Sequence, residues 1–382
     1  MTVNSLFFDI FLTLFEISCL IWYKFSQTYE ILPIFDMNQA YFETLPKDYF
    51  GDLYQKVSSS LTKGENVCIS VIPGFGEKTI FNFLTFNFRN DKLFDGIYVY
   101  DPELEAENLT DFCKKIESKK TAKNKLIIIR FFEQVDDKPH VLEKLDSIRR
   151  KNPKNLIYLV ITNQEAYLNP SSHQAISTVF FSELKFIYPF NIGQTKKMID
   201  SLKNYYGWKI NPSIYREIYR LSGGVPRIIK YLTKELYESR IKLTDKDKLI
   251  QIPQIEFQLR FLTNILITLS QNRLQILGLI DEKSHLKSSL LKYYLKNYIS
   301  EIITRLYPQL GNTETKVLSF FSENEGKIIS LDNIANLMKM SDDNFSLWAI
   351  YKVISRLKPK VKNNFEIKNI KGKGYMLKKI NQ

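Results

Sequence analysis

The residues most suited to chemistry lie in the segment Pro73–Thr79, which reads Pro-Gly-Phe-Gly-Glu-Lys-Thr. The apolar run over 66–72 before it predicts a buried strand, and an apolar helix is predicted from Ile80. This order is the layout of a phosphate-binding loop. Its backbone N–H groups surround phosphate, the lysine reaches the terminal phosphates and the hydroxyl binds Mg²⁺. The candidate nucleotide-binding residues of the loop are Gly74, Gly76, Lys78 and Thr79.

The residues around this loop argue against efficient ATP hydrolysis. A Walker A loop has glycine directly before its lysine, whereas this chain has Glu77 there. Ile72 stands where the first glycine of the pattern would be, unless Glu77 is an insertion after Gly74-Phe75-Gly76. A carboxylate about 4 Å from a phosphate charge is repelled by about 4 kcal/mol at an effective dielectric of about 20. The predicted third strand does not end in the acidic pair that holds magnesium, and only Glu133, Asp136 or Asp137 could substitute.

Three alternatives for the loop stay open: a structural P-loop domain, nucleotide binding without efficient turnover, and an active ATPase. We expect at most a weak ATPase. ATP or ADP with Mg²⁺ is the candidate cofactor, and the sequence establishes none.

A second group of residues with chemical potential lies near the C-terminus. Ile350, Ile354 and Leu357 recur at i, i+4 and i+7, which predicts a helix with one apolar stripe and a basic opposite side. Residues 365–377 contain a Gly-Lys-Gly tip between two extended runs, which predicts a β-hairpin. A helix followed by a basic hairpin is how a winged helix meets DNA, with the helix in the major groove and the hairpin along the backbone.

The charge of this stretch favours an anionic partner. Between Tyr351 and Lys379 the only acidic residue is Glu366, among many lysines. A solvated surface is the usual interpretation of a charge run, and a protein-binding winged helix is the alternative to DNA binding. The candidate DNA-binding residues are Tyr351, Lys352, Ser355, Arg356, Lys358 and Lys360 in the helix, with Lys371, Gly372, Lys373, Gly374 and Tyr375 in the hairpin.

The last quarter of the chain resembles the OmpR/PhoB-type winged-helix DNA-binding domain. The resemblance rests on Ile-Ser-Arg-Leu-Lys-Pro-Lys at 354–360 and Ile-Lys-Gly-Lys-Gly-Tyr at 370–375, with 312–321 and 329–335 similar to the first two helices of that family. It implies a transcription regulator that binds double-stranded DNA. Domains of this type usually follow a phosphoacceptor receiver domain in two-component regulators. No receiver pattern is visible in this sequence, so phosphorelay control is implied only by analogy.

This resemblance has three departures. Trp348 stands where a basic, DNA-contacting residue is usual, Pro359 lies in the last turn of the recognition helix, and Asn369 replaces a usual threonine in the wing. These changes affect the expected base-reading contacts more than the expected backbone contacts.

The elements that must position the loop alternate between strand and helix. Further buried strands are predicted at 96–100, 125–129, 156–161 and 184–188, separated by helical or polar stretches. Continuous apolar strands alternating with helices predict an α/β fold with a parallel, doubly wound sheet. Helices are then predicted over 192–206, 212–221 and 226–239.

The run Leu221–Lys230, with Gly-Gly-Val-Pro-Arg inside it, resembles the lid helices of AAA+ ATPases of the origin-recognition and related bacterial type. The AAA+/STAND-like resemblance covers roughly 48–239, including the loop. It implies that Arg227 is the sensor 2 arginine and that Asn163, after the fourth strand, is the polar sensor 1.

With 382 residues, the chain exceeds the size at which single cores stop growing, so two or three domains are expected. The predicted organisation is an N-terminal amphipathic helix and lead-in over 1–40, an AAA+-like P-loop core over 41–190, a helical lid over 191–250, a helical linker over 251–300 and the winged helix over 301–382. The net charge of +13 suggests nucleic acid first and an acidic membrane surface second, although biased coding composition could also produce it.

The stretch Leu6–Tyr23 is the most apolar one. Asp9 and Glu16 interrupt it and it is shorter than about 20 residues, so we expect an amphipathic helix packed on protein, with membrane association as the alternative. Three cysteines without CxxC spacing or a histidine cluster predict neither a zinc site nor a disulfide framework, so a reducing cytoplasm is the default.

The sequence thus predicts a cytoplasmic DNA-binding protein, sequence-specific or semi-specific, in which a degenerate P-loop module positions a winged helix that regulates transcription. The alternative is an ATP-dependent, initiator-like AAA+ switch that acts on DNA. A third hypothesis is a membrane-associated sensor. A homo-oligomer is compatible with each of them.

Overall fold

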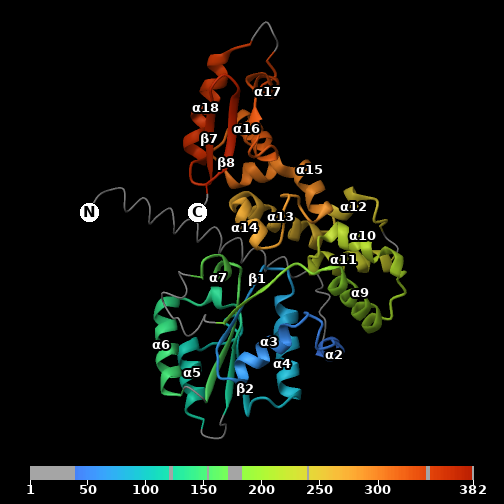
Figure 1. Cartoon of the computed structure of the whole chain (residues 1–382), viewed down its shortest axis with the longest axis vertical. Coiled ribbons are helices and arrows are strands. Elements are labelled where there is room, and N and C mark those ends of the chain that lie inside the picture. Colours follow the sequence, from blue (N-terminus) through green and yellow to red (C-terminus); the bar gives the residue numbers. More distant parts are fainter. Residues whose placement is uncertain are drawn as a thin grey trace, which may run out of the picture. The chain divides into compact units, whose positions relative to one another are not determined.

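The computed structural model describes residues 39–119, 124–152, 155–170, 183–238, 241–340 and 345–380. The chain divides into two compact units, of which the first ends at Thr44 and contains helix α2 (Gln39–Glu43). The predicted helix over Leu6–Tyr23 lies outside the described residues. None of the helices described is long and apolar enough to cross a membrane. The second unit comprises the residues from Leu45 onward (Figure 1).

A five-stranded parallel sheet forms the first part of this unit. Its strands are β1 (Val67–Val71), β2 (Gly96–Tyr100), β3 (Lys125–Ile129), β4 (Leu156–Thr162) and β5 (Glu183–Ile187). They lie in the order β2-β3-β4-β1-β5, and every neighbouring pair is parallel. All residues of β1, β3 and β4 are buried, as their uninterrupted apolar runs predict. The predicted parallel α/β sheet is confirmed.

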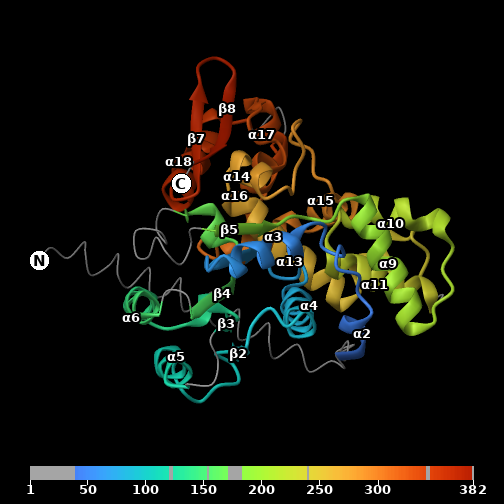
Figure 2. The same cartoon turned by 60° about the horizontal axis from the view of Figure 1, so that its bottom comes forward.

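Helices cover both faces of the sheet. They are α3 (Leu53–Thr62), α4 (Glu77–Asn90), α5 (Leu109–Glu117), η2 (Phe132–Gln134), α6 (Lys138–Lys151) and α7 (Glu165–Leu168). Helices α5 and α6 lie on one face and α3 and α4 on the other (Figures 1 and 2). The loop at Pro73–Thr79 therefore joins β1, an interior strand between β4 and β5, to a helix packed on the sheet.

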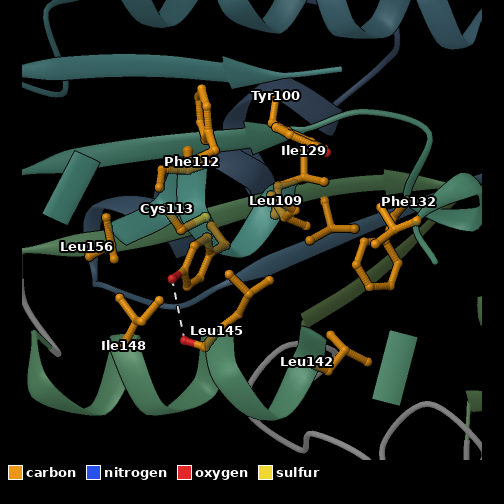
Figure 3. Packing of buried hydrophobic residues seen from close by; sticks show 14 of the residues in the cluster. Tyr100, Leu109, Phe112, Cys113, Ile129, Phe132, Leu142, Leu145, Ile148 and Leu156 are labelled. Carbon is orange, nitrogen blue, oxygen red and sulfur yellow. Dashed lines mark hydrogen bonds between the residues drawn. The ribbon is translucent and has the colours of Figure 1, made fainter. Parts of the chain in front are cut away.

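The face under α5 and α6 holds a contiguous apolar cluster (Figure 3). Leu142, Leu145 and Ile148 of α6 meet Phe112 and Cys113 of α5 and the strands beneath. The one polar group of Tyr158 in this cluster is satisfied, since its hydroxyl donates to the carbonyl of Leu145 at 3.4 Å. Cys113 is a free cysteine whose burial raises the pKa of its thiol.

A helical section follows the sheet. It contains α9 (Ile192–Tyr206), η3 (Pro212–Ile214), α10 (Tyr215–Ser222), α11 (Pro226–Tyr237), α12 (Lys246–Ile250), α13 (Pro253–Thr268), α14 (Gln271–Ile276) and α15 (Ser289–Leu306). The turn between α10 and α11 requires glycine, because Gly224 has a φ of +82° and a Cβ there would lie 2.0 Å from the carbonyl oxygen of Phe190. Pro226 then occupies the first turn of α11, where its missing N–H costs nothing.

The C-terminal section is a winged helix. It consists of α16 (Asn312–Glu323), β6 (Ile328–Ile329), α17 (Leu331–Leu337), α18 (Leu347–Val361), β7 (Phe365–Ile370) and β8 (Gly374–Lys379). The three strands form an antiparallel sheet in the order β6-β8-β7. Ser330 caps α17, since its Oγ accepts from the backbone N–H of Asn333 at 3.2 Å. Pro359 lies inside α18, near its end.

A cavity test probes the cluster shown in Figure 3. Leu145 is fully buried, so Leu145→Ala should lower the free energy of unfolding by about 2–5 kcal/mol, measured by chemical denaturation followed by circular dichroism. The matched control is Leu104→Ala, whose side chain is 81% exposed and whose loss should change stability by less than about 0.5 kcal/mol. Equal effects of the two substitutions would contradict this packing.

Candidate functional site

Helix α18 has two opposite faces. Ile350, Ile354 and Leu357, with Val361, are buried, and they pack α18 against α16 and α17. The predicted apolar stripe is therefore present. The other face exposes Trp348, Tyr351, Lys352, Ser355 and Arg356, which follow each other at helical spacing.

The first turn of α18 is capped and carries an aromatic side chain. The Oγ of Ser346 accepts from the backbone N–H of Ala349 at 3.3 Å, which fixes where the helix begins. The ammonium of Lys352 lies 4.4 Å from the ring centroid of Trp348, a cation–π distance. The exposed face thus combines a positive charge with an aromatic ring.

Two predicted DNA-binding residues make contacts inside the domain. Lys360 Nζ lies 2.6 Å from the carboxylate of Glu314 and donates to the carbonyl of Gln309 at 3.1 Å. Burial of Glu314 opposes its ionisation, but the hydrogen bonds from Lys360 and from the N–H of Gly311, with the charges of Lys360 and Arg356, together outweigh it and hold the pKa of that carboxyl below its ordinary value. Tyr375 is buried, its burial raises its pKa, and the ammonium of Lys358 lies 5.7 Å from its ring centroid.

The β7–β8 hairpin presents the predicted basic tip. Lys371, Gly372 and Lys373 are exposed, and the N–H of Lys373 closes the turn by donating to the carbonyl of Ile370 at 2.9 Å. Gly374 is buried with a φ of +128°, and a Cβ there would lie 2.0 Å from the carbonyl oxygen of Ile329. The tip lysines can therefore face a partner, whereas Gly374 allows β8 to pass close to β6.

The phosphate-loop residues stand at the N-terminus of α4. Gly74 and Gly76 have φ values of +87° and +93°, and Gly76 precedes the first helical turn, which contains Lys78 and Thr79. The first amides of a helix have no intrahelical acceptor, so this turn could donate to a phosphate. The N–H of Phe75 is already used, because it donates to the carbonyl of Ile72 at 2.9 Å.

The two predicted sensor positions reach this loop region through backbone contacts. Ser70 Oγ at the end of β1 donates to the carbonyl of Asn163 at 2.7 Å, which ties Asn163 to the strand that leads into the loop. The N–H of Arg227 donates to the carbonyl of Gly74 at 3.3 Å, so α11 touches the loop itself. The guanidinium of Arg227 lies 5.4 Å from the ring centroid of Phe257.

A side chain that the sequence did not indicate lies against the loop. Gln258 on α13 is buried and its Nε2 donates to the carbonyl of Pro73 at 3.1 Å. A Cβ at Gly74 would lie 1.9 Å from Gln258 Oε1, so the amide occupies the space that Gly74 leaves. The two partners are 185 residues apart in sequence. The only local signal was a polar residue among the apolar residues of this helix.

The acidic residues Glu77 and Glu133 beside the loop form a pair whose carboxyl groups are buried, although both residues remain partly exposed. The residue Glu77 is partly exposed, yet its Oε1 atom is buried and has no hydrogen-bond partner in the described part of the chain. Glu133 accepts from Thr162 Oγ1 at 3.1 Å and from the N–H of Asn163 at 3.2 Å. Burial raises the pKa of both carboxyls, and the neighbouring Glu133 raises that of Glu77 further.

Glu133, Asp136 and Asp137 are the three acids that could substitute for a magnesium-binding pair, and the structure brings Glu133 beside the loop. Glu133 is partly buried in η2, whereas Asp136 and Asp137 are exposed. Arg130, at the end of β3, forms an ion pair with Asp101 at 2.8 Å. No group of three His, Cys, Asp or Glu residues able to hold a metal ion occurs among the residues described.

Lys78, Thr79 and the first amides of α4 are the groups that would hold a phosphate and its metal ion. Two side chains oppose phosphate binding. The carboxyl of Glu77 would have to stay neutral or would repel the phosphate, and Gln258 is packed on Gly74 of the loop. The arrangement keeps the backbone of a phosphate loop while two side chains work against its ligand.

The C-terminal section matches a known family. Residues 307–377 match the family described as transcriptional regulatory protein, C terminal. This match spans helices α16 to α18 and most of the wing, and it confirms the OmpR/PhoB-type winged helix predicted from the sequence. A comparison with curated proteins finds no matching sequence.

Several solved structures are similar to most of the chain. The RuvB Holliday junction branch migration motor of Thermotoga maritima has a TM-score of 0.40 at 14% identity, covering 88% of this chain and 93% of that one. The ORC1 protein of Aeropyrum pernix in complex with DNA has 0.38 at 9%, covering 91% and 94%. The replication initiator DnaA bound to AMPPCP and single-stranded DNA has 0.37 at 13%, covering 81% and 90%. At such TM-scores the likenesses carry no functional argument.

The buried acid pair predicts an unusual dependence of stability on pH. Because the folded state raises the pKa of Glu77, it retains a proton that the unfolded chain releases, so stability falls as pH rises from the ordinary carboxyl range toward the raised pKa. Glu77→Gln removes this penalty and should therefore raise the melting temperature more at pH 8 than at pH 5.

The matched control is Glu143→Gln on the exposed side of α6, which should give no such difference between the two pH values. A Glu77→Gln effect that is equal at both pH values, or larger at pH 5, would contradict the buried-pair interpretation.

Proposed function

We propose that this chain, whose residues 307–377 belong to the family of C-terminal domains of transcriptional regulatory proteins, binds double-stranded DNA and regulates transcription in the cytoplasm. The observation that carries the proposal is the arrangement of exposed cations. Lys352 and Arg356 lie on the exposed face of α18, and Lys371 and Lys373 lie at the tip of the wing. No ion pair to another described residue neutralises any of these four side chains.

The two elements would divide the work of recognition. The N-terminal residues of α18 would reach base edges in the major groove, as in helix-turn-helix proteins generally. The wing lysines would contact phosphates, which fixes orientation without reading sequence. Lys360, Lys368 and Lys379 contribute less, because they pair with Glu314, Glu366 and Glu325 at 2.6, 3.2 and 3.2 Å.

The P-loop module would serve as a mount for the winged helix. Helix α13 contacts both parts: Gln258 donates to the loop, and the carbonyl of Leu266 accepts from Lys379 Nζ of β8 at 2.5 Å. Helix α15 packs against α16, the first helix of the winged domain. In this proposal the loop is structural, and an ATP-dependent switch is the competing function. A homo-oligomer stays a prediction.

DNA binding of this kind depends on salt. If about five phosphates are neutralised, log K should fall against log salt with a slope of about −4.5 for the full chain and a random-sequence duplex, measured by fluorescence anisotropy. Lys373→Ala should make the slope less steep by about 0.9.

The control for net charge is Lys63→Ala, at the exposed end of α3, which should leave the slope unchanged. An affinity that barely responds to salt, or an equal change from the two substitutions, would count against a DNA interface on α18 and the wing.

The structural role of the loop gives a separate prediction. A ligand that binds only the folded state raises the stability of that state by an amount set by the ratio of ligand concentration to Kd. Because a purely structural loop does not bind nucleotide, Mg-ATP at millimolar concentration should leave the melting temperature unchanged. A rise that Lys78→Ala and Arg227→Ala each abolish would instead support the ATP-dependent switch. Mg-ADP should be tested in parallel.

A further inference from the structure

The N-terminal end of α18, from Phe345 just before the helix to Tyr351, exposes an unusual concentration of large apolar side chains. Phe345, Leu347, Trp348 and Tyr351 leave 42, 43, 68 and 45% of their surface exposed. In the described chain no other stretch of seven residues exposes more than two large hydrophobic side chains. Single exposed apolar residues are ordinary, but a group of them marks a contact surface.

This apolar group is continuous with the basic face. Trp348 and Tyr351 lie one helical turn before Lys352 and Ser355 on the same side of α18, and the ammonium of Lys352 lies 4.4 Å from the indole ring. A partner seated here must therefore be anionic at its rim and offer apolar groups beneath. A membrane surface also combines these properties, but the exposed residues of the β7–β8 hairpin beside α18 are charged or polar, namely Glu366, Asn369, Lys371, Lys373 and Lys378 besides Gly372.

We propose that Trp348 and Tyr351 contact the C5-methyl groups of thymine in the major groove, so that the chain prefers thymine-rich duplex sites. This inference rests on the proposed DNA binding and names what its base-reading surface selects. The N-terminal residues of a recognition helix meet the base edges, and Trp348 is the second residue of α18. In the major groove the C5-methyl group marks the thymine of an A·T or T·A pair, whereas the other base-edge groups are hydrogen-bond donors and acceptors.

The chemistry of the side chains agrees with this choice. A guanine edge is read by a bidentate Arg or Lys and an adenine edge by Asn or Gln. The first turn of α18, Leu347–Ile350, contains none of these residue types. Burial of one methyl group from water should strengthen binding about fourfold.

The test compares two duplexes that differ only in the methyl groups. Alternating d(AT) and d(AU) duplexes of equal length keep the same pairing, while uracil lacks the C5-methyl. The full chain should bind the thymine duplex about fourfold more tightly, or more if several methyls are contacted. Trp348→Ser should bring the thymine-to-uracil ratio toward one and leave affinity for the uracil duplex nearly unchanged, because serine offers neither the ring nor the bidentate amide that reads adenine. Trp348→Leu, which stays apolar, should retain part of the ratio.

Two controls separate this preference from general DNA binding. Lys373→Ala should weaken binding to both duplexes equally and keep the ratio. Leu104→Gln removes an exposed apolar side chain far along the sequence and should change neither affinity nor ratio. Because Trp348 is largely exposed, its variants should melt at the wild-type temperature.

The outcomes are distinguishable. If the wild type binds both duplexes equally and with the expected salt dependence, DNA binding stands and the thymine inference falls. If Trp348→Ser weakens both duplexes to the same extent, the ring contacts DNA in another way and the inference also falls. If neither duplex binds at low salt, both the inference and the proposed function are wrong.

Discussion

Burial of one side of α18 is the constraint on which the candidate interface depends. Ile350, Ile354, Leu357 and Val361 fix the rotation of the helix about its own axis. Because a helix places residues three and four apart on one side, this burial decides that Trp348, Lys352 and Arg356 face outward together. Pro359 is tolerated in the same helix because it comes after the residues that face outward, near the helix end.

The sequence predicted the parts of the structure that local patterns control. Uninterrupted apolar strands, the period of α18 and the Gly-Lys-Gly tip of the wing all arise from neighbours in the chain, and each is present. It could not predict contacts between distant segments. The burial of Tyr375 and the packing of Gln258 on the loop each depend on residues brought together by the fold. Two of the predicted DNA-binding residues, Lys360 and Tyr375, are therefore engaged inside the domain in ways that spacing does not reveal.

In the P-loop, too, the backbone follows the local sequence pattern, whereas the side chains depend on contacts with distant segments. The glycines at 74 and 76 keep left-handed conformations, as a loop that curls toward a helix N-terminus needs. The side chain at position 77 places a carboxyl that is buried and close enough to Glu133 for both effects to raise the pKa of Glu77. A strand-loop-helix framework can thus persist in a sequence whose side chains oppose the ligand that the framework suggests.

Helix α13 gives the two halves of the molecule a shared mechanical element. Gln258 and Leu266 lie on one uninterrupted helix, and at about 1.5 Å per residue their backbone positions are about 12 Å apart along its axis. The separation between the loop contact at Pro73 and the wing contact at Lys379 is therefore set by the fixed rise of a single helix, rather than by a flexible connection.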